Sequence, residues 1–418
     1  GEVIMRISNN MMYKNNLNSI LNSQQNVSKA QEQVSTQKRV LTSSDDPSAM
    51  ARAQLLTDRI QVTEQFNKNV DFLVGRLTTE ESVLDNITNA IQRANTLTIQ
   101  AGNGALNELD RKGIAAEIGE IQKELFELMN SKSEDGKYIF SGYQDGTQTY
   151  IFDSTSNRYE YQGDQGKHEM EIASGVLVKA SDNAFDTFET VDKRLNVNSN
   201  LGNVSGGIVS ASVYVDNQTS FNKFHTNYYN ADPTAPLNAN TITIDIISGT
   251  PDQYQVLQAG TPITPPVTGT FTGEAIKFGG IEIEVQGTAP GQVEFELEKP
   301  GKENILNTLQ DLSAALVDTN ISDADFGEVI SSSIVQIENA SNKVSLVQAG
   351  LGARLNVSEK VEQNNQSTEI TDKSFRASLV EIDLTEAITE LSKQETSLQA
   401  SQATFGRLAN LSLFDYIR

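Results

Sequence analysis

Apolar residues recur at helical spacing in both outer parts of the chain, and the pattern is strongest some way inside the ends. After residue 300, one series recurs every seven residues, at Ile330, Ile337, Val344 and Leu351. Before it, a second series follows the alternating three- and four-residue spacing of a long coiled-coil helix, with Glu80 as its charged interruption: Val70, Leu73, Leu77, Leu84, Ile87, Ile91 and Ala94. The pattern predicts long helices that pair through shared apolar seams.

The two ends of the chain carry weaker seams of similar design. Gln24, Gln31 and Lys38 occupy seam positions of the first, and Glu395 and Gln402 interrupt the last. Such helices bury too little apolar surface to offset their ordering, so we expect arms that fold when a neighbouring copy covers them. An ordinary bundle within one chain is the alternative. The predicted assembly-arm residues are Ile7, Tyr13, Ile20, Val27, Val34, Leu41, Leu384, Ile388, Leu391, Leu398, Phe405, Leu411, Leu413 and Phe414.

The middle of the chain has a different composition. Eight of the nine prolines lie between residues 233 and 300, and nine of the eleven tyrosines lie between residues 138 and 254. Helices can therefore run long only in the outer parts. The Asn- and Gly-rich stretch at residues 196–207 is interpreted as a linker between two β units. Strands are predicted at residues 149–152, 158–162, 176–179, 241–247, 254–257, 281–285 and 293–297.

These patterns predict an α+β fold, in which both chain ends build a long-helix coiled-coil bundle with an inserted outer β-rich domain of one or two β units. We interpret residues 1–4 as an expression-vector remnant before a natural start at Met5. The other predicted parts are an N-terminal polymerisation arm at 5–46, helical core at 47–142 and 301–383, the outer β-rich domain at 143–300, and a C-terminal polymerisation arm at 384–418.

Charge and composition exclude several classes of function. A formal net charge of -23 argues against binding to nucleic acid or to an anionic membrane. The absence of cysteine excludes disulfides, thiol nucleophiles and cysteine zinc sites. No run of apolar residues approaches the length of a membrane span, and the N-terminus lacks the apolar core of a signal peptide. We therefore expect no nucleic-acid partner and no membrane insertion.

The residues before the second helix have a physical interpretation of their own. In Asp45-Asp46-Pro47, an aspartate before proline can cap a helix whose first turn begins at the proline, where the missing N–H costs nothing. The two carboxylates could also begin a metal site, but no nearby motif completes a calcium loop. We favour a helix cap.

Candidate chemistry is sparse. His168 and His225 are the two histidines, and His168-Glu169 lacks the second histidine of a zinc-peptidase motif. Phosphate-binding and nucleophile-elbow motifs are absent. Carboxylate pairs such as Asp182 with Asp186, or Glu282 with Glu284, are interpreted as solvated faces, and Tyr228 with Tyr229 as strand packing. We predict no catalytic, metal or cofactor-binding residues and no cofactor.

Four local patterns, in order and spacing, resemble the bacterial flagellin family and its hook-filament junction branch. They are the opening Met5-Arg6-Ile7-Ser8, the Leu41–Ala49 stretch, the segment Asp135–Gly142 and the ending Leu411–Arg418. Pro47 favours the junction branch over filament flagellins.

The resemblance implies a structural, non-enzymatic subunit of the bacterial flagellum whose ends fold on assembly. It implies an adapter ring at the hook-filament junction, formed by self-association between another hook-associated protein and flagellin. It also implies an extracellular location, type III export through the flagellar apparatus and an export chaperone at the C-terminal arm. The alternatives are a filament flagellin, or a flagellin-like subunit whose outer domain binds a ligand or has enzymatic activity.

Overall fold

The computed structural model describes the backbone of residues 2–416 and the side chains of residues 11–198 and 204–407. Its helices are α1 (Glu2–Thr36), α2 (Pro47–Ala101), α3 (Glu108–Met129), α4 (Gln218–Tyr228), α5 (Ile305–Val317), α6 (Asp323–Val380) and α7 (Leu384–Tyr416), with a π-helix at Phe185–Glu189. The chain divides into two compact units. The first contains Gly1–Gly75, Glu169–Val178 and Arg354–Arg418, and the second contains Arg76–His168 and Lys179–Ala353.

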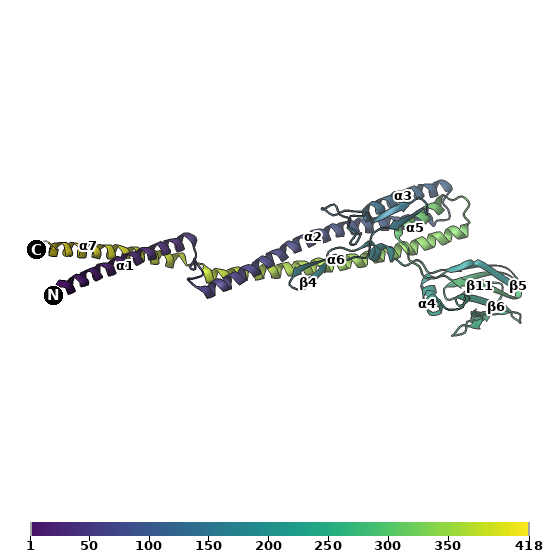
Figure 1. Cartoon of the computed structure of the whole chain (residues 1–418). Coiled ribbons are helices and arrows are strands. Elements are labelled where there is room, and N and C mark those ends of the chain that lie inside the picture. The colour runs from purple at the N-terminus through teal and green to yellow at the C-terminus, as the bar shows by residue number, and fades with distance from the viewer. Residues whose placement is uncertain (1, 417–418) are drawn as a thin grey trace. The chain divides into compact units, whose positions relative to one another are not determined.

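In the first unit, the two terminal helices α1 and α7 lie side by side (Figure 1). The same unit holds the first part of α2 and the last part of α6, together with the hairpin of β3 (Glu169–Ala173) and β4 (Val176–Lys179). Among the α2 side chains in this unit, the apolar residues buried are Ala49, Ala53, Ile60, Val70 and Leu73. Val70 and Leu73, the two members of the predicted α2 seam that lie in this unit, are therefore buried as expected.

In the second unit, the rest of α2 and α6 combines with α3 and α5 into a helical bundle (Figure 1). Buried Gln122 ties α3 to α5, because its Nε2 donates to the carbonyl of Leu306 at 2.8 Å. Glu80 is fully buried, and its Oε1 accepts the backbone N–H of Asp182 at 3.0 Å. The charged residue in the predicted seam thus anchors the segment that follows β4. The buried apolar seam residues include Leu77, Leu84, Ile87, Ile91, Ile118, Leu125, Ile337 and Leu351.

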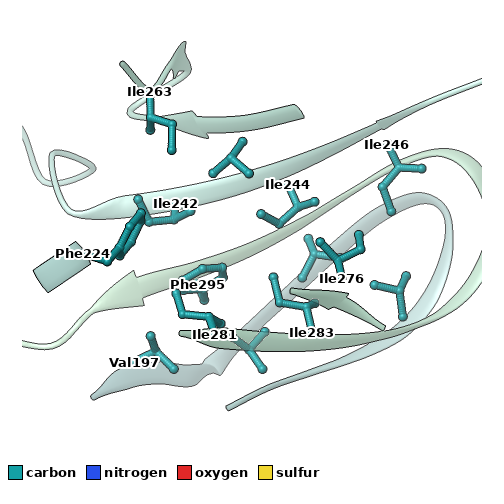
Figure 2. Packing of buried hydrophobic residues seen from close by; sticks show 14 of the residues in the cluster. Val197, Phe224, Ile242, Ile244, Ile246, Ile263, Ile276, Ile281, Ile283 and Phe295 are labelled. Atoms are coloured by element: carbon teal, nitrogen blue, oxygen red, sulfur yellow. The ribbon is translucent and has the colours of Figure 1, made fainter. Parts of the chain in front are cut away.

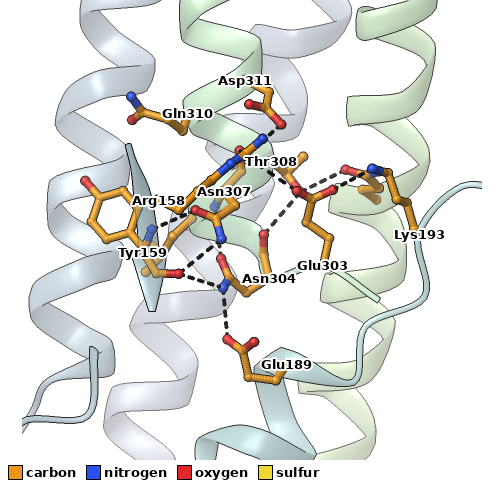
Figure 3. Close-up of polar contacts among 12 residues, drawn as sticks. Arg158, Tyr159, Glu189, Lys193, Glu303, Asn304, Asn307, Thr308, Gln310 and Asp311 are labelled. Atoms are coloured by element: carbon orange, nitrogen blue, oxygen red, sulfur yellow. Dashed lines mark hydrogen bonds and ion pairs between the residues drawn. The ribbon is translucent and has the colours of Figure 1, made fainter. Parts of the chain in front are cut away.

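A hairpin and a polar network cover one side of this bundle. The hairpin consists of β1 (Tyr150–Asp153) and β2 (Arg158–Tyr161). In Figure 3, the guanidinium of Arg158 lies 2.9 Å from the carboxylate of Asp311 on α5 and 3.6 Å from that of Glu303. Asn304 caps α5 and donates to Glu189 at 2.9 Å. The hairpin is thereby held against the start of α5.

The inserted sheet is antiparallel and belongs to the second unit. It contains β5 (Val197–Val215), β6 (Thr241–Ile247), β7 (Gln253–Gln258), β8 (Thr261–Pro262), β9 (Thr268–Thr270), β10 (Ile276–Phe278) and β11 (Ile281–Leu297). Strand β11 pairs with β5, β6 and β10. Figure 2 shows Ile242, Ile244, Ile283 and Phe295 from its central strands in one apolar core, and α4 adds Phe224. The prediction of an inserted β domain is confirmed.

Two details of the insertion differ from the sequence predictions. Residues 196–207 are not a linker, because Val197 onward forms the first half of β5 and pairs with β11. Gly206 allows the close packing of these strands, because it has φ +71° and a Cβ on it would lie 2.4 Å from the carbonyl oxygen of Pro290. The strands predicted at 281–285 and 293–297 are the two ends of one strand, β11, whose pairing with β5 shifts register around Gly287 and Gly291.

Candidate assembly surface

The seam between the terminal helices is only half closed. Ala30 and Ala387 are the buried apolar side chains among the described residues of α1 and α7. Tyr13, Leu384 and Ile388 are exposed, with 53% of the Tyr13 side chain open to solvent. Half-buried positions are Ile20, Val27, Val34, Leu41, Leu391, Leu398 and Phe405. Ile7, Leu411, Leu413 and Phe414, also predicted as arm residues, lie outside the residues whose side chains the structure describes.

The arms nevertheless meet through specific contacts. The ring centroids of Tyr13 and Phe405 lie 5.2 Å apart, tilted by 51°. Such an aromatic pair adds about 0.5–1.5 kcal/mol beyond the area that it buries. The structure therefore places the first and last predicted seams against each other, while leaving apolar surface that one chain does not cover.

Both arms join the rest of the first unit at a single joint, formed by residues 37–46 and 379–383. The backbone N–H of Arg39 donates to the carbonyl of Val380 at 2.7 Å, and that of Ile382 donates to Gln37 at 3.1 Å. Lys38 and Glu381 form an antiparallel bridge between these two segments. Backbone bonds thus connect the end of α6 to the turn that follows α1.

The two aspartates before Pro47 have different partners in this joint. Asp46 Oδ1 accepts the backbone N–H of Ala49 at 3.0 Å, at the first turn of α2. Asp45 instead binds the ammonium of Lys29 at 2.6 Å and the N–H of Thr42 at 3.0 Å. The bonds from Lys29 and Thr42 lower the pKa of Asp45 to about 2. Asp46 therefore caps α2, whereas Asp45 connects the turn to α1 through Lys29.

A corresponding aspartate, not predicted from the sequence, lies in front of the last arm. Asp383 Oδ1 accepts the backbone N–H of Thr385 at 2.7 Å and that of Glu386 at 3.4 Å, and these bonds lower its pKa. The signal was present in the sequence, since Asp383 followed by Glu386 three residues later is typical of a helix start. Both long helices that follow the joint thus begin at an aspartate.

A groove of about 310 Å³ lies beside the joint. Its apolar residues are Met50, Ala53 and Val380, and its charged residues are Lys38, Arg376 and Glu381. The groove adds mixed apolar and charged surface next to the half-closed arm seam. Together they form the candidate assembly surface.

The polar residues singled out for chemistry have structural partners. His168 Nε2 lies 3.1 Å from the carbonyl oxygen of Gly142, and His225 Nε2 lies 2.7 Å from that of Glu298. The ring of Tyr229 stacks on His225 at 4.8 Å. Burial lowers the pKa of His225. These contacts hold the two histidines and Tyr229 within the packing of the second unit.

The carboxylate pairs and the remaining tyrosine are also engaged. Glu282 pairs with Lys277 at 2.7 Å, and Glu284 accepts a bond from Tyr214 at 3.3 Å. Tyr228 donates to the carbonyl of Thr264 at 3.0 Å. Asp182 pairs with Lys179, and Asp186 pairs with Lys167 at 3.1 Å.

Within the described part of the chain, no group of three His, Asp or Glu side chains is arranged to hold a metal ion. The helices described there also lack a stretch long and apolar enough to cross a membrane.

Comparison of the sequence with known proteins finds a matching family region and individual relatives. The bacterial flagellin N-terminal helical region matches residues 7–145. Flagellar hook-associated protein 3 of Salmonella typhimurium is 40% identical over 155 residues, covering 37% of this chain and 48% of the relative. The protein of the same name in Escherichia coli is 34% identical over 184 residues, covering 44% of this chain and 57% of the relative. The chain thus spans about half the length of these curated relatives.

A solved structure extends the similarity beyond these segments. The crystal structure of the flagellar junction protein FlgL from Legionella pneumophila matches with a TM-score of 0.56 and 26% sequence identity. The match covers 79% of this chain and 100% of that one. The fold of helical core and inserted β structure is therefore shared with that protein.

Proposed function

We propose that the chain is a structural subunit of the bacterial flagellum, because its residues 7–145 match the bacterial flagellin N-terminal helical region. Its place is the hook-filament junction, where it acts as an adapter ring between another hook-associated protein and flagellin. The similarity to the Legionella junction protein over 79% of this chain supports that place. The proposed role is mechanical and needs no catalytic residue.

The observation that carries the proposal is the half-closed seam between α1 and α7. Val27, Val34 and Leu398 recur at seam spacing but remain half-buried in a single chain. Each square ångström of apolar surface removed from water contributes about 25 cal/mol, so a neighbour that covers this seam stabilises the arms as it binds. Self-association therefore supplies the surface that the isolated chain lacks.

The remaining partners follow from the same role. The ring contacts another hook-associated protein on one side and flagellin on the other. The chain reaches this extracellular site through the flagellar type III apparatus, and an export chaperone binds the C-terminal arm before assembly. The exposed Leu384 and Ile388 at the start of α7 offer that chaperone apolar anchors.

A deletion strain tests the position of the subunit. Cells that lack the chain are expected to release unpolymerised flagellin into the medium, because the first flagellins have no adapter. Reintroducing the wild-type gene restores attached filaments. Filaments that stay attached to the hook in the deletion strain would refute the junction role.

A pair of single substitutions tests the seam itself. Val27→Asp places a charge in the half-buried seam, whereas Ser28→Asp places the same charge on the exposed face of α1. We expect the Val27 variant to be secreted but absent from purified hook-filament junctions, because a buried unpaired carboxylate opposes docking. The Ser28 variant is expected to assemble. Equal incorporation of both variants would exclude the arm seam as the assembly surface.

A further inference from the structure

The apolar seven-residue series of α6 continues in the first unit, but with polar residues. The spacing that runs through Ile337, Val344 and Leu351 goes on to Ser358, Asn365 and Asp372. These three polar side chains are as buried as the apolar ones, at 0%, 8% and 4% exposure. Within Arg354–Val380, all of which the structure describes, no apolar side chain is buried. This half of α6 therefore meets α2 through a polar seam.

The most deeply placed charge in that seam has one partner. Asp372 Oδ2 lies 3.3 Å from a guanidinium nitrogen of Arg59 on α2, and no side-chain or backbone donor completes a hydrogen bond to it. The Arg59 side chain is 57% exposed, so water screens the pair, whereas the buried carboxylate has lost most of its hydration. The pair thus contributes little to holding α6 on α2.

A second orphaned atom lies near the same seam. Asn67 on α2 donates to Glu369 at 2.9 Å, but its own Oδ1 is buried without a hydrogen-bond partner. Buried polar atoms that lack partners oppose packing. Both helices therefore contribute polar groups that are poorly satisfied when the seam is closed.

The β3–β4 hairpin lies across this polar seam and bonds to both helices. Asn365 on α6 donates to the carbonyl of Ile172 at 2.9 Å. Asn69 on α2 donates to the neighbouring carbonyl of Glu171 at 2.8 Å. The side chain of Ile172 is fully buried. The hairpin thus supplies an apolar side chain and two acceptors where the helices themselves supply polar residues.

We propose that residues 354–380 of α6 form a separately opening segment, held on α2 chiefly by the β3–β4 hairpin acting as a strap. Opening exposes Asn365, Asp372 and Asn67 to water, which offsets much of the apolar contact that is lost. A polar residue in a coiled-coil seam also fixes register, so the segment recloses in one alignment.

Native-state hydrogen exchange of the purified full chain tests the proposal. Amides of residues 354–380 are expected to exchange at least about tenfold faster than those of residues 330–351 in the same helix, because local opening precedes global unfolding. Equal protection of the two stretches would overturn it.

Matched substitutions test whether the polar seam itself, rather than low stability of the whole first unit, causes the faster exchange. The double change Arg59→Leu with Asp372→Leu replaces the ion pair by apolar side chains and is expected to slow exchange of residues 354–380 about tenfold. Asp71→Leu, at an exposed position of α2, is the control and should change nothing. Unchanged or faster exchange in the double variant would refute the polar seam as the cause.

A third variant tests the strap. Ile172→Ala keeps both hairpin hydrogen bonds to the backbone but removes the buried side chain, so exchange of residues 354–380 should rise about tenfold or more while that of residues 330–351 stays unchanged. Protection that remains at the wild-type level would show that the hairpin does not hold the segment.

Discussion

The guanidinium of Arg39 donates a hydrogen bond to the backbone carbonyl of Leu379 at 2.7 Å, joining residues that are 340 positions apart in the sequence. The same guanidinium lies 3.4 Å from the carboxylate of Asp46, which caps α2. One side chain therefore connects the end of α6, the start of α2 and the turn that leaves α1.

Loss of this side chain should loosen the joint without unfolding the helices. We expect Arg39→Ala to raise the rate of proteolytic cleavage within residues 37–46 about tenfold, since a charge-assisted hydrogen bond is removed. Limited proteolysis followed by mass spectrometry measures the rate. Arg52→Ala, at an exposed position in the same unit, is the control, and equal cleavage of the two variants would show that Arg39 does not hold the joint.

The cap at Asp383 gives a second prediction. Asp383→Ala removes the acceptor for the amides of Thr385 and Glu386, so the first turn of α7 should fray and its amides should exchange about fivefold faster. Asp383→Asn keeps a capping oxygen and should retain most of the protection. Hydrogen exchange resolved to residues 384–390 distinguishes the two variants. Identical protection in the alanine variant would mean that the arm does not rely on this cap.

The pKa of Asp45 predicts acid sensitivity at the same joint. Its ordinary value of 3.8 falls to about 2 in the folded chain. Because the folded pKa is lower than the unfolded one, the stabilisation is complete above about pH 4 and is lost as the pH falls through about 2. Nuclear magnetic resonance can follow the amide of Thr42 as the pH falls. Its resonance should titrate with a midpoint near pH 2.

Lys29→Gln provides the control for that titration. Without the ammonium that binds Asp45, the midpoint should move back toward 3.8. A midpoint at the ordinary value in the wild-type chain would contradict the pairing of these two residues.

The glycines of β5 give a prediction for the sheet. Gly206→Ala adds a Cβ 2.4 Å from the Pro290 carbonyl oxygen in a left-handed backbone conformation, and should lower the free energy of unfolding of the sheet by about 1–3 kcal/mol. Gly260 has a similar φ of +79° but no atom within 4 Å of its Cβ position. Gly260→Ala should therefore lower the free energy of unfolding by less than Gly206→Ala does. Denaturant-dependent hydrogen exchange of β11 amides compares the two variants. Equal losses of unfolding free energy would exclude the close approach of Gly206 to Pro290 as the cause.

The helical part could be predicted because its signal is local and repeated. Leu84, Ile87 and Ile91 follow the seam spacing and are fully or almost fully buried in the bundle. The continuation through Ser358 and Asn365 could not be predicted in this way, because polar residues at seam positions resemble an exposed face. Asn365 is bonded instead to the β3–β4 hairpin, whose Ile172 carbonyl lies 193 positions away in the sequence.

The inserted sheet was predicted as a class but not in its pairing. The stretch at 196–207 resembles a linker because Gly and Asn lower its apparent strand propensity. Gly206 and Gly207 are required by the close approach of β11, a contact that no local pattern reveals. In the joint, Asp46 was found through the proline beside it, whereas Asp383 lacks that proline.

The most direct test of the account is a cryo-electron microscopy map of intact hook-filament junctions that contain this chain. A ring of copies is expected between the hook and the first flagellins, with Val27 and Leu398 covered by neighbouring subunits. A map in which the arm seams face solvent, or in which the chain is distributed along the filament, would contradict it.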